Sequence, residues 1–210
     1  MKESVAAPMG RRELLVKTAP ACAMACLGLG RVPGLAGAVS GLPSQEVHKF
    51  DKQMDREFTN KELAQIMNRG TFQMIKTLRE DLGDGEAVRL LKLNSDEIGR
   101  QQGKAQAASV PDTSFENFVS VFRQMANGDY LTGEVVEDTD KVFEMRVTEC
   151  LTGTVYREAG FEGDIGHAAV CNMDYTWPPA FNPDFKMERT KTLMQGHDCC
   201  NHRYINTADR

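Results

Sequence analysis

The sequence predicts an α+β fold, in which N-terminal helices are followed by an antiparallel sheet with interspersed short helices. Two observations lead to this prediction. Up to about residue 125, apolar residues recur at helical spacing. After Asn127 and Gly128, apolar and polar residues alternate instead, which is the period of a strand. Helices that precede strands, rather than alternate with them, are typical of α+β domains.

Four helices are expected in the first part of the chain. The first has apolar side chains at helical spacing, at Val47, Phe50, Met54 and Phe58. The second covers residues 63–78 and follows Thr59 and Glu62, which are spaced as a capping box. The third covers roughly residues 85–108 and the fourth residues 115–125.

A hairpin should follow, made of residues 130–136 and 141–148 around a turn-like segment. Its second strand has three apolar residues on one face, at Phe143, Met145 and Val147. Short helices are expected at residues 151–159 and 164–174. Two further extended stretches, at residues 185–194 and 199–205, complete the predicted sheet.

The first 38 residues are expected to be a signal peptide of the twin-arginine type, ahead of a single domain at residues 39–210. Arg11 and Arg12 precede an uncharged apolar run that is shorter than the roughly 20 residues of a membrane-spanning helix. A small-x-small cleavage site ends at Ala38. The resemblance to signals read by the twin-arginine export machinery implies a periplasmic or exported protein, with no membrane attachment after processing. A Sec signal and a lipid anchor are the alternatives.

The charge balance bears on the partners of the domain. The first 38 residues contain five Lys/Arg and two Asp/Glu, so 20 positive and 28 negative side chains remain. A net negative chain argues against a nucleic-acid partner. The sequence also lacks a glycine-rich phosphate loop and a Gly-x-Ser-x-Gly motif, which disfavours nucleotide and serine-hydrolase chemistry. A small molecule is the expected partner.

Two of the six cysteines lie in the expected signal peptide, and the other four are all in the last third of the chain, at Cys150, Cys171, Cys199 and Cys200. A fold built on disulfides would distribute them more evenly. The short Cys-x₂-Cys knuckle of a structural zinc finger is absent from the sequence. Disulfides, including a vicinal one, a nucleophilic thiol and a zinc or iron site assembled from distant residues all stay open.

Two rows of side chains can carry chemistry. In the expected helix at residues 164–174, the spacing i, i+4, i+7 puts one row on a single face: His167, Cys171 and Asp174. The alternative makes Cys171 an ordinary core residue. In the last strand the two-residue period puts Cys200 and His202 on one face and Cys199 on the other. The two adjacent cysteines should therefore have different roles.

A longer pattern runs in order through the last third of the chain. It comprises Cys150, Tyr156-Arg157-Glu158, Gly160, Cys171-Asn172-x-Asp174, Phe181-Asn182-Pro183, Arg189-Thr190-x-Thr192-x-Met194-x-Gly196 and Cys200. This order resembles the L-2-amino-thiazoline-4-carboxylic acid hydrolase family. The resemblance implies hydrolysis of 2-aminothiazoline-4-carboxylate to N-carbamoyl-cysteine, and its site residues here would be Cys150, Cys171, Asp174 and Cys200. His202 and His167 depart from the pattern, which has an aromatic residue and a small or apolar residue there.

Roles follow from what this reaction requires. Asp174 is expected to be the general base or an orienting carboxylate, with Cys171 or Cys200 as nucleophile or metal ligand. Arg189 or Arg203 would hold the substrate carboxylate through a bidentate contact. The candidate ligands of a divalent metal, zinc or iron, are Cys150, Cys171, Cys200 and His202.

Two other functions compete with the hydrolase. One is an exported protein that binds a metal or a small ligand through the Cys/Asp/His residues, without hydrolytic activity. The other is a binding domain stabilised by disulfides.

Overall fold

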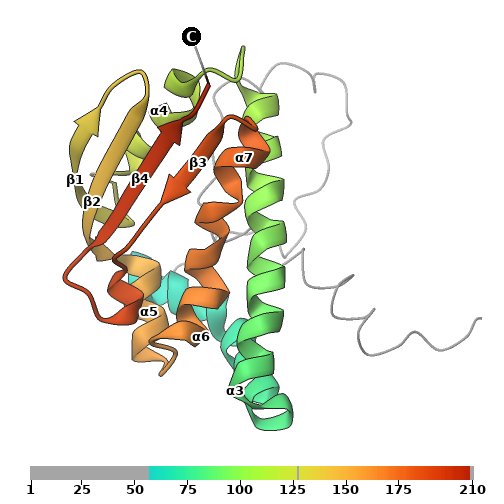
Figure 1. The fold of residues 1–210 in the computed structure, drawn as a ribbon. Coiled ribbons are helices and arrows are strands. Elements are labelled where there is room, and N and C mark those ends of the chain that lie inside the picture. The colour runs from blue at the N-terminus through green and yellow to red at the C-terminus, as the bar shows by residue number, and fades with distance from the viewer. Residues whose placement is uncertain (1–56, 127, 209–210) are drawn as a thin grey trace, which may run out of the picture.

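The computed structural model describes residues 57–126 and 128–208. Figure 1 confirms the α+β prediction: a long helix runs beside an antiparallel sheet, and shorter helices connect the strands. The expected signal peptide and nearly all of the first expected helix lie outside the described residues, so both stay predictions. Within the described residues, no helix is both long enough and apolar enough to cross a membrane.

Helix α3 (Asn60–Ser109) contains the second and third expected helices. The predicted capping box is present, because the Thr59 side chain accepts a bond from the Glu62 N–H while the Glu62 carboxylate accepts one from the Thr59 N–H. Gly83 separates the two arms of α3 with φ 78° and ψ 162°, a backbone conformation that only glycine adopts readily. The two predicted helices therefore meet at one residue instead of a loop.

Four strands of the described residues form one antiparallel sheet in the order β1-β2-β4-β3. The strands are β1 (Leu131–Asp138), β2 (Val142–Cys150), β3 (Phe185–Glu188) and β4 (Cys200–Asn206). Across β2 and β4, Met145 lies opposite His202 and Val147 opposite Cys200. The predicted faces are thus confirmed, since these residues share the sheet face that packs on the helices.

Helix α4 (Phe115–Met125) has the predicted bounds, and it covers that face. Its N-cap is Ser114, whose side chain accepts a bond from the Asn117 N–H. Phe118 and Phe122 pack on Tyr204 of β4, with ring centroids 5.3 and 4.4 Å apart. Aromatic packing between α4 and β4 fixes the strand that carries Cys200.

The segment after β2 is helical but irregular. Helix α5 (Leu151–Glu158) matches its prediction. The prediction of one regular helix at residues 164–174 is wrong in detail, because three kinds of helix follow one another there. They are α6 (Asp164–Gly166), a π-helical turn η2 (His167–Cys171) and a 3₁₀ turn η3 (Asn172–Tyr175). Helix α7 (Trp177–Phe181) follows and was not predicted.

The stretch expected to be extended at residues 185–194 is a strand only as far as Glu188. The 3₁₀ turn η4 (Leu193–Gln195) replaces its end. This turn begins because the Thr192 hydroxyl accepts a bond from the Gln195 N–H, and it ends at Gly196 with φ 85°. The residues between β3 and η4 therefore leave the sheet.

Helix α3 packs on η3 and α7 with no room for side chains at two glycines. A Cβ at Gly99 would lie within 3.0 Å of the Met173 carbonyl oxygen and the Thr176 hydroxyl. A Cβ at Gly103 would also lie within 3.0 Å of a backbone atom, the Trp177 carbonyl oxygen. Figure 1 shows the resulting parallel course of α3 and the α6–α7 segment.

Candidate functional site

Arg189, the first residue after β3, is the centre of a buried polar network. Its side chain is 1% exposed, and Nη1 lies 2.7 Å from Oδ2 of Asp174. Its guanidinium also stacks on the ring of Tyr175, with Cζ 4.9 Å from the ring centroid. A buried cation requires such partners, because burial without them costs several kcal/mol.

All five N–H donors of the Arg189 guanidinium face protein acceptors. Besides Asp174, the partners and their distances are the Tyr175 hydroxyl (3.4 Å), the Cys171 carbonyl oxygen (2.7 Å), Nε2 of His202 (3.5 Å) and Nε2 of His167 (3.4 Å). The network therefore gathers β4, η2 and η3 around one guanidinium. No donor is left for a substrate carboxylate, unless that carboxylate displaces one of these partners.

The irregular helix explains why the Cys171 carbonyl is available. Cys171 is the last residue of the π turn and the N-cap of the 3₁₀ turn that follows. Carbonyl groups at such transitions take partners outside the helix, and here Arg189 supplies the donor. In a 3₁₀ turn side chains three residues apart eclipse, so Cys171 and Asp174 keep the common face that was predicted. Single-turn π segments are frequent at functional sites.

The two histidines face Arg189 as acceptors. A guanidinium has only donors, so each Nε2 must be unprotonated and each ring carries its proton on Nδ1. In His202 this Nδ1 lies 3.4 Å from the Tyr204 hydroxyl. Burial lowers the pKa of His202 to about 4, with Asp174 opposing the shift and Arg189 adding to it. Burial and Arg189 likewise lower the pKa of His167, so both rings are neutral.

Three thiols surround the network: those of Cys150, Cys171 and Cys200. Burial raises the pKa of each of them, and the charge on Asp174 adds to the rise in all three. Cys150 caps α5, where its Sγ accepts a bond from the Gly153 N–H at 3.3 Å. The Cys200 Sγ accepts one from the Leu193 N–H at 3.2 Å. These cysteines are therefore thiols, not thiolates, in this state of the protein.

Asp174 is the network member with a free oxygen. Its Oδ2 pairs with Arg189, while Oδ1 has no hydrogen-bond partner among residues 57–126 and 128–208. The side chain is 19% exposed, so water can reach it. A carboxylate that is oriented through one oxygen and open at the other can position a water molecule and accept its proton.

Comparisons with known proteins identify the family of the chain. The model of the L-2-amino-thiazoline-4-carboxylic acid hydrolase family matches residues 50–204. The chain belongs to that family. No curated protein matches significantly. Among solved structures, the phenol-responsive sensory domain of the transcription activator PoxR, with phenol, is similar over 74% of this chain and 78% of that chain, at 12% identity and a TM-score of 0.47. That similarity is too low to bear on function.

Most of the candidate site residues come together in the structure. Cys150, Cys171, Asp174, Cys200 and His202 surround Arg189 or influence one another's pKa. Tyr175 and Tyr204 belong to the network although the sequence did not single out a role for them. The sequence feature that could have identified Tyr175 is its position next to Asp174. Tyr204 shares the predicted face of β4.

Arg203, a candidate for substrate binding, lies elsewhere. It projects from the opposite face of β4, where Nη1 pairs with Glu137 at 2.6 Å and Glu144 at 2.5 Å. Strand parity already placed Arg203 away from Cys200, so that candidate conflicted with the face argument. The bidentate role expected for Arg189 is not what the structure has either, since its donors already bond protein groups.

Cys199 is also separate from the network. It is buried beside Asp198, with Sγ 3.9 Å from Oδ1. All four cysteines of the described chain are free thiols here. Within the described ranges, no three His, Cys, Asp or Glu side chains are arranged to hold a metal ion.

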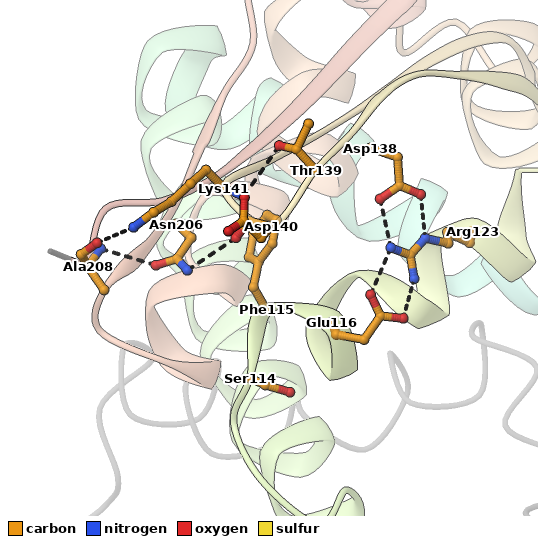
Figure 2. Close-up of a pocket in the computed structure, with 10 residues that line it drawn as sticks. All are labelled: Ser114, Phe115, Glu116, Arg123, Asp138, Thr139, Asp140, Lys141, Asn206 and Ala208. Carbon is orange, nitrogen blue, oxygen red and sulfur yellow. Dashed lines mark hydrogen bonds and ion pairs between the residues drawn. The ribbon is translucent and has the colours of Figure 1, made fainter. Parts of the chain in front are cut away.

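A cavity of about 640 Å³ lies at the other end of the sheet, between α4, the β1–β2 turn and the end of β4. Figure 2 shows Arg123 there, bonded to both Glu116 and Asp138. Asn206 in its wall is six residues along β4 from Cys200, or roughly 20 Å of extended chain. This cavity shares no residue with the Arg189 network.

The histidine at position 202 should make stability depend on pH. The unfolded state takes up a proton near pH 6.5, whereas folded His202 does so only near pH 4. The contribution of neutral His202 to the free energy of unfolding is therefore complete above pH 6.5. As the pH falls towards 4, up to about 3 kcal/mol of this free energy is lost. His202→Phe keeps an aromatic ring but removes the group that takes up the proton. Urea unfolding between pH 4 and 7.5 should show a shallower loss of stability in the variant; identical slopes would contradict the neutral, buried histidine.

Proposed function

We propose that this protein hydrolyses small cyclic amidines that carry a carboxylate, with 2-aminothiazoline-4-carboxylate as the first candidate. Family membership supports a hydrolase-type activity. The observation that carries the proposal is the partly exposed Asp174 carboxylate, which the buried Arg189 orients. Water held at Oδ1 of Asp174 is a base-activated nucleophile of the kind that an amidine carbon requires.

The reaction would proceed in two steps. Water adds to the amidine carbon while Asp174 accepts its proton. The bond between that carbon and the ring sulfur then breaks, and the sulfur leaves as a thiolate that takes up a proton. One water is consumed, and the product from 2-aminothiazoline-4-carboxylate is N-carbamoyl-cysteine.

The thiols fit a role without a covalent intermediate. A cysteine nucleophile needs a thiolate, but burial raises the pKa of Cys171 and Cys200. As neutral groups they can donate hydrogen bonds to the departing sulfur or to the substrate. Arg189 stays a positioning residue, because it acts on the reaction through Asp174.

The same geometry does not fit a zinc or iron ion. The His202 Nε2 that should bind the metal already faces the Arg189 guanidinium, and within the described ranges no three His, Cys, Asp or Glu side chains are arranged to hold an ion. No step is therefore assigned to a metal.

Asp174→Asn tests the proposed base. The amide keeps the shape of the side chain but cannot accept the proton, so kcat should fall by about 10²- to 10⁴-fold. The measurement is thiol release from 2-aminothiazoline-4-carboxylate. Asp198→Asn is the matched control, since Asp198 also pairs with a cation, Lys191 at 3.0 Å, but lies exposed and outside the network. Its kcat should equal that of the wild type.

Two results would refute the proposal. If Asp174→Asn turns over as fast as the wild type, Asp174 is not the base. If the wild type releases no thiol from any of a panel of cyclic amidines, the function as a small-ligand-binding protein replaces the hydrolase.

A further inference from the structure

A second cavity, of about 380 Å³, lies between the start of β1, the end of β2 and α5. Its volume is within the range of small-ligand sites, roughly 300–1,000 Å³. Cys150 forms part of its wall and is half-buried. Burial raises the pKa of Cys150 and the charge on Asp174 adds to the rise, so this cysteine is within electrostatic reach of the Arg189 network.

Arg157 provides a cation at this cavity. Its Nε donates to the Gly153 carbonyl oxygen at 3.3 Å, and the N–H of the same glycine donates to the Cys150 Sγ at 3.3 Å. The guanidinium is thus anchored one helical turn from the thiol. Its terminal nitrogens have no carboxylate partner in the part of the chain that the structure describes. In contrast, Arg123 at the larger cavity is bonded to two carboxylates.

Two carboxylates line the same cavity from the side of the sheet. Glu149 accepts a bond from the Thr132 hydroxyl through Oε2 at 2.6 Å, and its Oε1 has no partner among the described residues. Asp129 lies just before β1. The lining of the cavity therefore combines a guanidinium from α5 with carboxylates from β2 and from the residues before β1, a set of charges complementary to a molecule with one negative and one positive group.

We propose that this cavity is the entry subsite for a small zwitterion, with its carboxylate on Arg157 and its amidinium or ammonium group on Glu149 and Asp129. The occupant would contact the Cys150 thiol. This inference rests on the proposed function, because it names the charge pattern of the substrate that reaches Asp174. A cyclic amidine with a carboxylate, such as 2-aminothiazoline-4-carboxylate, has that pattern when protonated.

Alkylation of Cys150 tests the subsite without any need for turnover. The full chain is treated with iodoacetate or with iodoacetamide, and peptide mass spectrometry gives the rate at Cys150. Iodoacetate carries the carboxylate that Arg157 should attract, so Arg157→Gln should lower the iodoacetate-to-iodoacetamide ratio roughly threefold, the size of an exposed charge contact. Arg146→Gln is the control, since Arg146 is an exposed arginine of β2 outside the cavity.

The second arm of the experiment measures how far a bound ligand protects Cys150 from alkylation. Millimolar 2-aminothiazoline-4-carboxylate should slow alkylation of Cys150 in the wild type and not in Arg157→Gln, whereas 2-aminothiazoline, which lacks the carboxylate, should protect both equally. A Cys150 that does not react, or a ratio that Arg157→Gln leaves unchanged, would overturn the subsite even if the protein releases thiol. Charge-dependent labelling and protection without thiol release would uphold the subsite and refute the hydrolase.

Discussion

Replacement of Arg189 by methionine should lower the free energy of unfolding by about 3–5 kcal/mol, the cost of removing one partner of a buried ion pair. The variant leaves the Asp174 carboxylate and the Cys171 carbonyl without their donor. It should also reduce thiol release, because Asp174 loses its orientation. Urea unfolding followed by circular dichroism measures the first effect.

Arg203→Met is the matched control. Arg203 also pairs with two carboxylates, but it is 33% exposed. Surface pairs contribute at most about 1 kcal/mol each, so this variant should stay close to the wild type in stability and unchanged in activity. Equal losses in the two variants would mean that the Arg189 network is no more than an ordinary surface ion pair.

Gly99→Ala should destabilise the protein by about 1–3 kcal/mol, although alanine is the better helix former. The added Cβ would clash with the Met173 carbonyl oxygen and the Thr176 hydroxyl, so η3 must move away from α3. Because η3 carries Asp174, activity should fall as well. Thermal unfolding and the thiol-release assay report the two effects.

Gly70→Ala in the same helix should instead raise the free energy of unfolding. A Cβ at Gly70 would meet nothing within 4 Å, so only the gain in helix propensity remains, about 0.5–1 kcal/mol. Activity should not change. If both substitutions stabilise the protein, α3 does not pack closely against η3 at Gly99.

The fold was largely readable from the sequence where periodicity and capping agree. Thr59 and Glu62 predicted the start of α3, and Phe143, Met145 and Val147 predicted the buried face of the sheet. The kink at Gly83 was not predicted, since a glycine alone does not indicate a change of helix direction. Helix α7 was missed because it has only five residues, too few for a periodic signal, and two of them are prolines.

The site was readable only in part. Helix spacing and strand parity selected Cys171, Asp174, Cys200 and His202, which do lie around one centre. Arg189 was expected to hold a substrate carboxylate, which stays a prediction. Its place at the centre of the network could not be predicted, because its burial depends on packing that no local pattern encodes. The π turn is similarly invisible in sequence, since its residues, His167 to Cys171, also suit an α-helix.

The Arg189 network also has a consequence for how the chain folds. Its bonds join residues only 13 to 22 positions apart, whereas the contact between Asp96 and Asn172 spans 76 positions. By loop-closure entropy, the longer loop costs about 1 kcal/mol more to close. The bonds of the polar centre therefore lie within the last fifty residues of the chain, whereas the docking of α3 onto η3 requires a longer-range search.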